Sequence, residues 1–161
     1  MSKHTSNTPA ATFTCDRAWR RRFAGVASSV KAGRCWLETV AAEMGAPDEQ
    51  QATAALLLSE TATNALRHTA SAEQGYTVEV WARFAGWLRV EVRDAGSSSR
   101  PRVQARQAAP KRESGYGLAL VEAFAHTWGG LAPEQGSGVF FEIAWQPVAP
   151  HPPAPLDMPG M

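Results

Sequence analysis

The chain has 161 residues, 44% of them apolar, which suffices for one compact domain with a hydrophobic core but not for two well-packed ones. Its 16 lysines and arginines against 15 acidic residues leave a net charge of +1, which gives no general attraction to nucleic acid or to an anionic membrane. Two cysteines without metal-ligand spacing indicate reduced thiols in a cytoplasmic protein. No apolar run approaches the roughly 20 residues needed to cross a bilayer, and the polar start lacks a secretory signal.

The two ends of the chain have the composition of disordered segments. Residues 1–17 begin with a run rich in Ser, Thr, Asn and Pro, and residues 147–161 are rich in proline. Such segments cannot bury enough apolar surface to offset the entropy of ordering. We therefore expect one folded domain over residues 18–146.

The folded part begins with a short strand and a helix. Residues 19–23 alternate weakly as a strand, and Ser28 or Ser29 can cap a helix that runs to Met44 and stops at Gly45. Apolar residues recur in this helix at near-helical spacing and are expected in the core: Val30, Leu37, Val40 and Met44. Charged residues of the same helix are expected to face outward: Lys31, Arg34 and Glu38.

A second helix opens at Pro47 and Asp48 and meets no breaker before His68, which makes it the longest predicted element. One face is an apolar stripe of Ala55, Leu58, Ala62 and Leu66. The opposite face changes from apolar to polar along Leu56, Leu57, Glu60, Asn64, Arg67 and His68. This pattern predicts a helix covered on both sides. Glu60 and Asn64 would then be partly desolvated, and a buried carboxylate needs a partner or a ligand.

The second half of the chain reads as a hairpin, a long loop, a short helix and a last strand. The expected segments are strands 76–81 and 87–92 with a turn at 84–86, a loop at 97–114, a helix at 117–125, a turn at 128–130 and a strand at 139–145. This order of elements predicts an α+β fold. We expect a two-layer sandwich with helices on one face of a mainly antiparallel mixed sheet.

Glu60 and Asn64 form the first candidate site, because residues four apart share one face of a helix. An isolated pair of this kind is commonly just a solvated helix face. In the chemical alternative, Asn64 offers a neutral oxygen to Mg²⁺, which takes few protein ligands besides substrate phosphates. Glu60 then orients or deprotonates the hydroxyl or water that attacks a γ-phosphate. His68 lacks a second His or Cys at zinc-ligand spacing, so we expect it to be a structural hydrogen-bond partner.

Two glycine-containing motifs follow at Asp94-Ala95-Gly96 and Gly115-Tyr116-Gly117-Leu118. An aspartate at a strand end can accept a hydrogen bond from an adenine amino group, and Gly96 lets the base approach the backbone. Free N–H groups at a helix start attract phosphate. Each motif alone is usually a turn or a helix entry. Their order after Glu60 and Asn64 favours a nucleotide site.

Residues 57–69 resemble the N box of the GHKL ATPase superfamily, specifically its small anti-sigma factor serine kinases. Residues 94–96 resemble the G1 box and residues 115–121 the G2 box, and the resemblance spans about residues 18–145. It implies the Bergerat, or histidine-kinase-type ATPase, fold with ATP and Mg²⁺ as ligands, and residues 97–114 as the ATP lid. The implied site consists of Glu60 as general base, Asn64 as magnesium ligand, Asp94 against adenine, and Gly96, Gly115, Gly117 and Leu118 at the nucleotide.

The resemblance also implies a function and partners. A protein of this kind phosphorylates a serine of an anti-anti-sigma (STAS-type) protein and sequesters a sigma factor in the cytoplasm, without direct contact to nucleic acid or membrane. A homodimer is compatible with it. The alternative is a non-catalytic regulator with the same fold that binds ATP or a partner. The catalytic domain of a sensor histidine kinase fits less well, because we find no dimerisation helix with a phosphoacceptor histidine before the domain.

The sequence departs from the family motifs at two places, and it contains one basic patch that could bind a partner. Gly96 is followed by Ser97-Ser98-Ser99 where the G1 box often continues as Gly-x-Gly, and Gly138 stands where many relatives carry a threonine near the adenine. The arginines between Arg20 and Arg34 offer a surface for an acidic partner, although exposed arginines usually only increase solubility.

Overall fold

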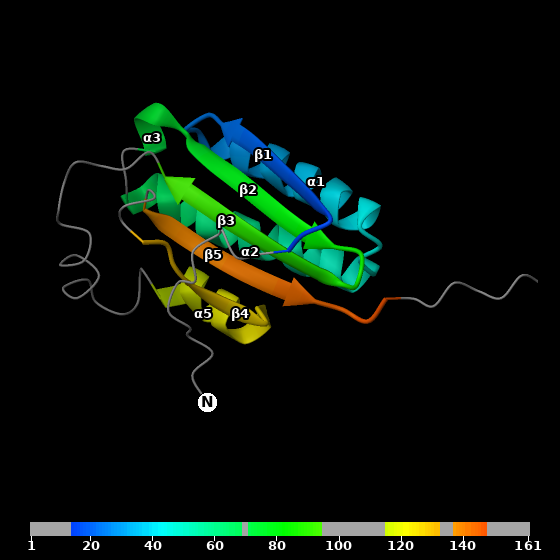
Figure 1. Ribbon diagram of the computed structural model, residues 1–161. Helices are drawn as coiled ribbons and strands as arrows, with labels where there is room; N and C mark the ends of the chain where they lie inside the picture. The colour runs from blue at the N-terminus through cyan, green and yellow to red at the C-terminus, as the bar shows by residue number, and fades with distance from the viewer. Residues whose placement is uncertain (1–13, 69–70, 95–114, 133–136, 148–161) are drawn as a thin grey trace, which may run out of the picture.

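The computed structural model describes residues 14–68, 71–94, 115–132 and 137–147. Helices cover one face of a five-stranded sheet with the strand order β1-β2-β3-β5-β4 (Figure 1). Each neighbouring pair of described strands is antiparallel. The elements are β1 (Arg17–Phe23), α1 (Ala27–Glu43), α2 (Asp48–His68), α3 (Ser71–Gln74), β2 (Tyr76–Arg83), β3 (Trp87–Asp94), α5 (Gly115–Phe124), β4 (Thr127–Gly130) and β5 (Gly138–Ala144). The predicted two-layer α+β sandwich is confirmed.

The core lies between the sheet and the helices. Alternate residues of β2 point into it because successive side chains of a strand face opposite sides, so Val78 and Val80 are fully buried there. Leu88, Val90 and Val92 of β3 line the same face. The helix α2 packs against β3, β5, α1 and α5. It therefore contacts each of the other elements that carry candidate site residues.

The first helix differs from the expectation at its start. Its N-cap is Val26, which makes no side-chain cap hydrogen bond. Neither serine caps it, and the Oγ of Ser29 instead hydrogen-bonds the Tyr76 hydroxyl at 3.1 Å, which ties α1 to β2. At the other end, Gly45 has a φ of 80°, so the predicted glycine stop is confirmed. Leu37, Val40 and Met44 are buried as predicted, whereas Val30 is only partly buried.

The second helix has the bounds that the sequence predicted, but it is not covered on both sides along its length. Leu57 is fully buried, while Leu56 and Arg67 are exposed. The helix α2 contacts the sheet and the helices α1, α3 and α5, and these contacts leave Leu56 and Arg67 exposed. Glu60 and Asn64 are half-buried, as expected.

The turn predicted at residues 128–130 is wrong, because Thr127–Gly130 form the edge strand β4. Four residues with two glycines give no alternating apolar signal, and the strand is defined by its pairing with β5. The short helix α3 was also not expected. The hairpin turn before Trp87 is confirmed: Gly86 has a φ of 99°, and a Cβ there would lie 2.0 Å from the Trp145 carbonyl oxygen.

Contacts of the folded domain begin before the predicted boundary at residue 18. The backbone N–H of Phe84 donates to Oδ2 of Asp16 at 2.9 Å, and β1 itself starts at Arg17. The expected loop at 97–114 and most of the two ends expected to be disordered lie outside the described residues. Within the described ranges, no helix combines the length and apolar character that a membrane span requires.

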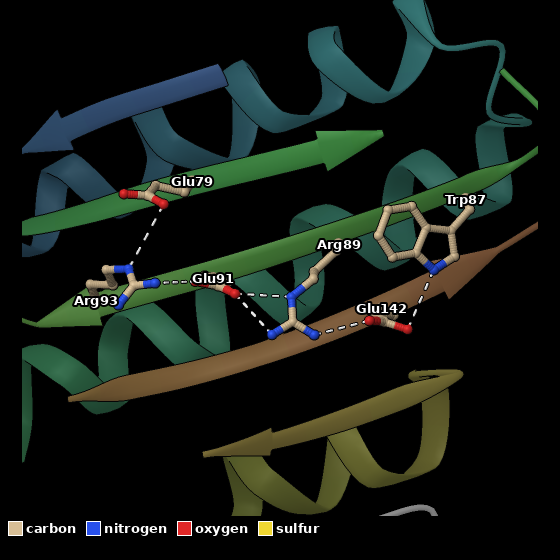
Figure 2. A network of polar contacts seen from close by, with 6 residues as sticks. All are labelled: Glu79, Trp87, Arg89, Glu91, Arg93 and Glu142. Carbon is tan, nitrogen blue, oxygen red and sulfur yellow. Dashed lines mark hydrogen bonds and ion pairs between the residues drawn. The ribbon is translucent and has the colours of Figure 1, made fainter. Parts of the chain in front are cut away.

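The face of the sheet without helices carries a network of charged side chains. Figure 2 shows it running across Glu79, Arg93, Glu91, Arg89, Glu142 and Trp87. Arg89 and Glu91 are only 2% and 1% exposed. The Arg89 guanidinium donates from Nε to Glu91 at 2.9 Å and from Nη1 to Glu142 at 3.0 Å, and it lies 3.8 Å from the centre of the Phe140 ring. Arg89 and Arg93 are therefore bound to carboxylates of their own strand and of the two neighbouring strands.

Candidate ATP-binding site

Glu60 and Asn64 lie one turn apart on a half-buried flank of α2. Thr61 between them is buried, and its hydroxyl donates to the Leu57 carbonyl oxygen at 2.8 Å within the helix. Neither Glu60 nor Asn64 forms a side-chain hydrogen bond or ion pair with any residue that the structure describes. A partly desolvated carboxylate and amide without partners among the described residues are available to a ligand.

Asp94 is the last residue of β3 and is half-buried. Its backbone N–H donates to the Ser137 carbonyl oxygen at 3.1 Å, which fixes the strand end against the start of β5. The helix α2 packs against β3, and both elements end on the same side of the molecule (Figure 1). The structure therefore brings the α2 flank and the end of β3 to one edge of the sandwich.

The first turn of α5 contains Gly115, Gly117 and Leu118, and α5 packs against α2. The first N–H groups of a helix have no partner within that helix and can bind a phosphate. The helix predicted from residue 117 is thus confirmed, and it starts two residues earlier, at Gly115. The side chains of residues 115–118 and of His68 lie outside the description, as do Gly96 and Ser97, so their predicted roles stay predictions.

Gly138 has a structural reason to be glycine. A Cβ at this position would lie 2.0 Å from the Val92 carbonyl oxygen and 3.0 Å from Cδ1 of Leu131. A threonine would therefore require a shift of β5 away from β3, its pairing partner. The sequence did not predict this close approach, because it joins residues far apart in the chain.

The donor set around α2 fits magnesium that arrives with a nucleotide. In the described ranges, no three His, Cys, Asp or Glu side chains come together as a metal site. Mg²⁺ needs no such cluster, because it commonly keeps waters and takes one or two protein oxygens plus substrate phosphates. The amide oxygen of Asn64, with the Glu60 carboxylate one turn away, supplies oxygens of that kind.

Comparison with protein-family models matches residues 23–130 to the histidine kinase-like ATPase domain. This match covers more than half of the chain, so the protein belongs to that family, within the GHKL superfamily. It is an ATP-binding protein of the GHKL type, whose members bind ATP with Mg²⁺. The matched range contains Glu60, Asn64, Asp94 and all of α5. No curated protein matches the chain.

Proposed function

We propose that this protein is an ATP-dependent protein serine kinase of the anti-sigma factor type. The observation that carries the proposal is the half-buried pair of Glu60 and Asn64, which face no protein partner in the described part of a chain that belongs to an ATP-binding family. The packing of α2 against β3 and α5 supports it, because the three candidate motifs lie on these elements.

Each residue has one proposed role in the transfer. Asn64 holds the Mg²⁺ of Mg·ATP through its amide oxygen, and Asp94 accepts a hydrogen bond from the adenine amino group. The bound metal neutralises charge on the phosphates. Glu60 accepts the proton of a serine hydroxyl on the partner, whose oxygen bonds to the γ-phosphorus while the bond from that phosphorus to the ADP oxygen breaks.

The proposed phosphoacceptor is an anti-anti-sigma (STAS-type) protein, and the proposed target of sequestration is a sigma factor. Resemblance of residues 57–69 to the N box of anti-sigma kinases supports both. This role puts the protein in the cytoplasm, and a homodimer is compatible with it. It requires no direct contact with nucleic acid or membrane.

The test is phosphate transfer from labelled ATP to a purified serine-bearing candidate partner. Glu60→Ala should lower the transfer rate by about 10²- to 10⁴-fold, the usual contribution of a general base, while Mg·ATP binding is retained. Glu49→Ala, which removes an exposed carboxylate from the first turn of the same helix, should leave the rate unchanged. A wild-type protein that binds Mg·ATP but labels no candidate partner contradicts the kinase and favours the non-catalytic regulator.

A further inference from the structure

A groove of about 780 Å³ lies between the first half of α1 and the last half of α2. Its lining includes Lys31, Arg34 and Glu38 of α1, Leu66 and Arg67 of α2, and Val30 as an apolar wall. Glu60 and Asn64 are not part of this lining. The groove therefore borders the α2 residues of the candidate ATP site without including them, since Ser59, Thr63 and Arg67 beside them line it.

The groove is lined by the lysine and arginine side chains of the described chain that form no ion pair, hydrogen bond or ring contact. Lys31, Arg34 and Arg67 are exposed, and none forms an ion pair, hydrogen bond or ring contact within the described ranges. Arginines elsewhere in those ranges are engaged, as Figure 2 shows for Arg89 and Arg93. The remaining contacts are Arg17 with Glu43, Arg20 with Glu79, Arg21 with the Phe23 ring, Arg22 with the Gln74 carbonyl, and Arg83 with the Thr14 carbonyl and the Trp87 ring.

The structure thereby divides the basic patch that the sequence indicated between Arg20 and Arg34. Arg20 and Arg22 of β1 are bound to groups of neighbouring elements, and Arg21 lies over the Phe23 ring of its own strand, whereas Lys31 and Arg34 line the groove. The described lining of the groove contains three cationic side chains and one carboxylate, that of Glu38. The first turn of α1 contains no acidic residue. The groove is therefore positively charged and attracts anionic groups.

The dimensions of the groove suit a short stretch of polypeptide. Its α1 wall extends from Ala27 to Glu38, which is ~16 Å at the helical rise. About five extended residues span this length. Its cations are exposed, whereas pockets for small molecules enclose most of the surface of their ligand. Val30 and Leu66 add an apolar surface between the charges.

We propose that this groove binds an acidic segment of a partner protein, with carboxylates against Lys31, Arg34 and Arg67 and an apolar side chain against Val30 and Leu66. The inference goes beyond the proposed phosphate transfer, because it assigns partner binding to a surface that does not include Glu60 or Asn64. Its test requires no ATP.

The probe is a fluorescein-labelled peptide library with four Glu or Asp and two Leu residues per peptide, and a matched library with Gln in place of each acid. Fluorescence anisotropy with the full-length protein should show binding of the acidic library that weakens as salt is added, since exposed charges are screened. The double variant Lys31→Glu/Arg34→Glu should weaken this binding by at least about tenfold, the scale of close charge contacts at an interface.

The control is Arg20→Glu, which reverses an arginine side chain that is 73% exposed but lies on β1, outside the groove. It should leave peptide binding unchanged. Equal weakening by Arg20→Glu, equal binding of the Gln library, or no binding by wild type overturns the proposal. Displacement of the peptide by inorganic phosphate alone, at matched ionic strength, overturns it in favour of a small-anion site. Peptide binding without any Mg·ATP binding would count against the proposed kinase and leave the groove proposal intact.

Discussion

In the proposed site Asn64 has the most specific role, because a neutral amide oxygen would contribute to nucleotide binding mainly through the metal. Asn64→Ala should weaken binding of Mg·ATP by about tenfold or more, ~1.4 kcal/mol, because one metal ligand is lost. Binding of ADP in the presence of a chelator should hardly change. Calorimetric titration with and without Mg²⁺ separates the two. Equal losses under both conditions would contradict the metal role of Asn64.

Substitution of Gly138 tests whether the packing of β5 against β3 requires glycine at this position. Gly138→Ala places a Cβ 2.0 Å from the Val92 carbonyl oxygen, so we expect a loss of about 1–3 kcal/mol in the free energy of unfolding. The matched control is Gly130→Ala on the neighbouring strand β4, where a Cβ meets nothing within 4 Å. Urea denaturation of both variants measures the difference. Similar stabilities of the two would contradict the close approach of β5 to β3.

At this scale the sequence identified Glu60, Asn64 and Asp94 as candidates because their motifs are local. It did not reveal why Gly138 must be small, and it grouped Arg20 with Arg34. Both depend on contacts between residues far apart in the chain. Gly138 must be small because of the Val92 carbonyl, and Arg20 differs from Arg34 because it pairs with Glu79 of the next strand.

Disruption of the charged side-chain network on β3 and its neighbouring strands should lower the free energy of unfolding more than loss of an exposed ion pair. Glu91→Ala leaves the buried guanidinium of Arg89 without its closest carboxylate, and breaking a buried pair in this way costs ~3–5 kcal/mol. Glu43→Ala removes a carboxylate whose pair with Arg17 is half-exposed, and it should cost at most about 1 kcal/mol. Chemical denaturation compares the two variants, and a mild effect of Glu91→Ala would contradict the burial of the network.

The contact between α1 and β2 predicts an alkaline effect on stability. Burial raises the pKa of the Tyr76 phenol above its usual value, and the hydrogen bond with Ser29 partly offsets this. A raised pKa means that the folded state holds the proton more tightly. The resulting stability is complete below the unfolded pKa of about 10 and is lost as the pH rises through the folded value.

Tyr76→Phe should therefore be less stable than wild type at pH ~8, by the ~1 kcal/mol of a lost hydrogen bond. The gap should narrow or reverse above pH ~10, because phenylalanine does not ionise. Urea midpoints across this pH range measure the gap. A constant gap would show that the Tyr76 phenol has no raised pKa.

Local signals predicted the elements well where periodicity and breakers agree. The bounds of α2 and the hairpin of β2 and β3 followed from a long unbroken helical pattern and from alternation around Gly86. The start of α1 was misjudged because Ser29 bonds to Tyr76, a residue distant in sequence. The strand β4 was missed because its residues carry no apolar alternation, and pairing with β5 defines it.

At the scale of the whole molecule, α2 separates two surfaces of different chemistry. The helix α2 carries Glu60 and Asn64 and packs against β3 and α5, and its residues Ser59, Thr63, Leu66 and Arg67 line the cationic groove with α1. This arrangement allows nucleotide and partner to contact the same helix without sharing a site. The overall sandwich could be predicted from the order of the elements, whereas the groove could not, because it depends on how α1 and α2 lie side by side.

Calorimetric titration of the full-length protein with Mg·ATP tests most directly whether this fold binds Mg·ATP at the edge formed by α2, β3 and α5. We expect saturable binding at one site per chain. Asp94→Ala should weaken it by at least about tenfold, because the adenine amino group loses its acceptor, while the fold is retained. A folded wild-type protein that does not bind Mg·ATP, or an Asp94→Ala variant that binds it as well as wild type, would contradict the proposed site.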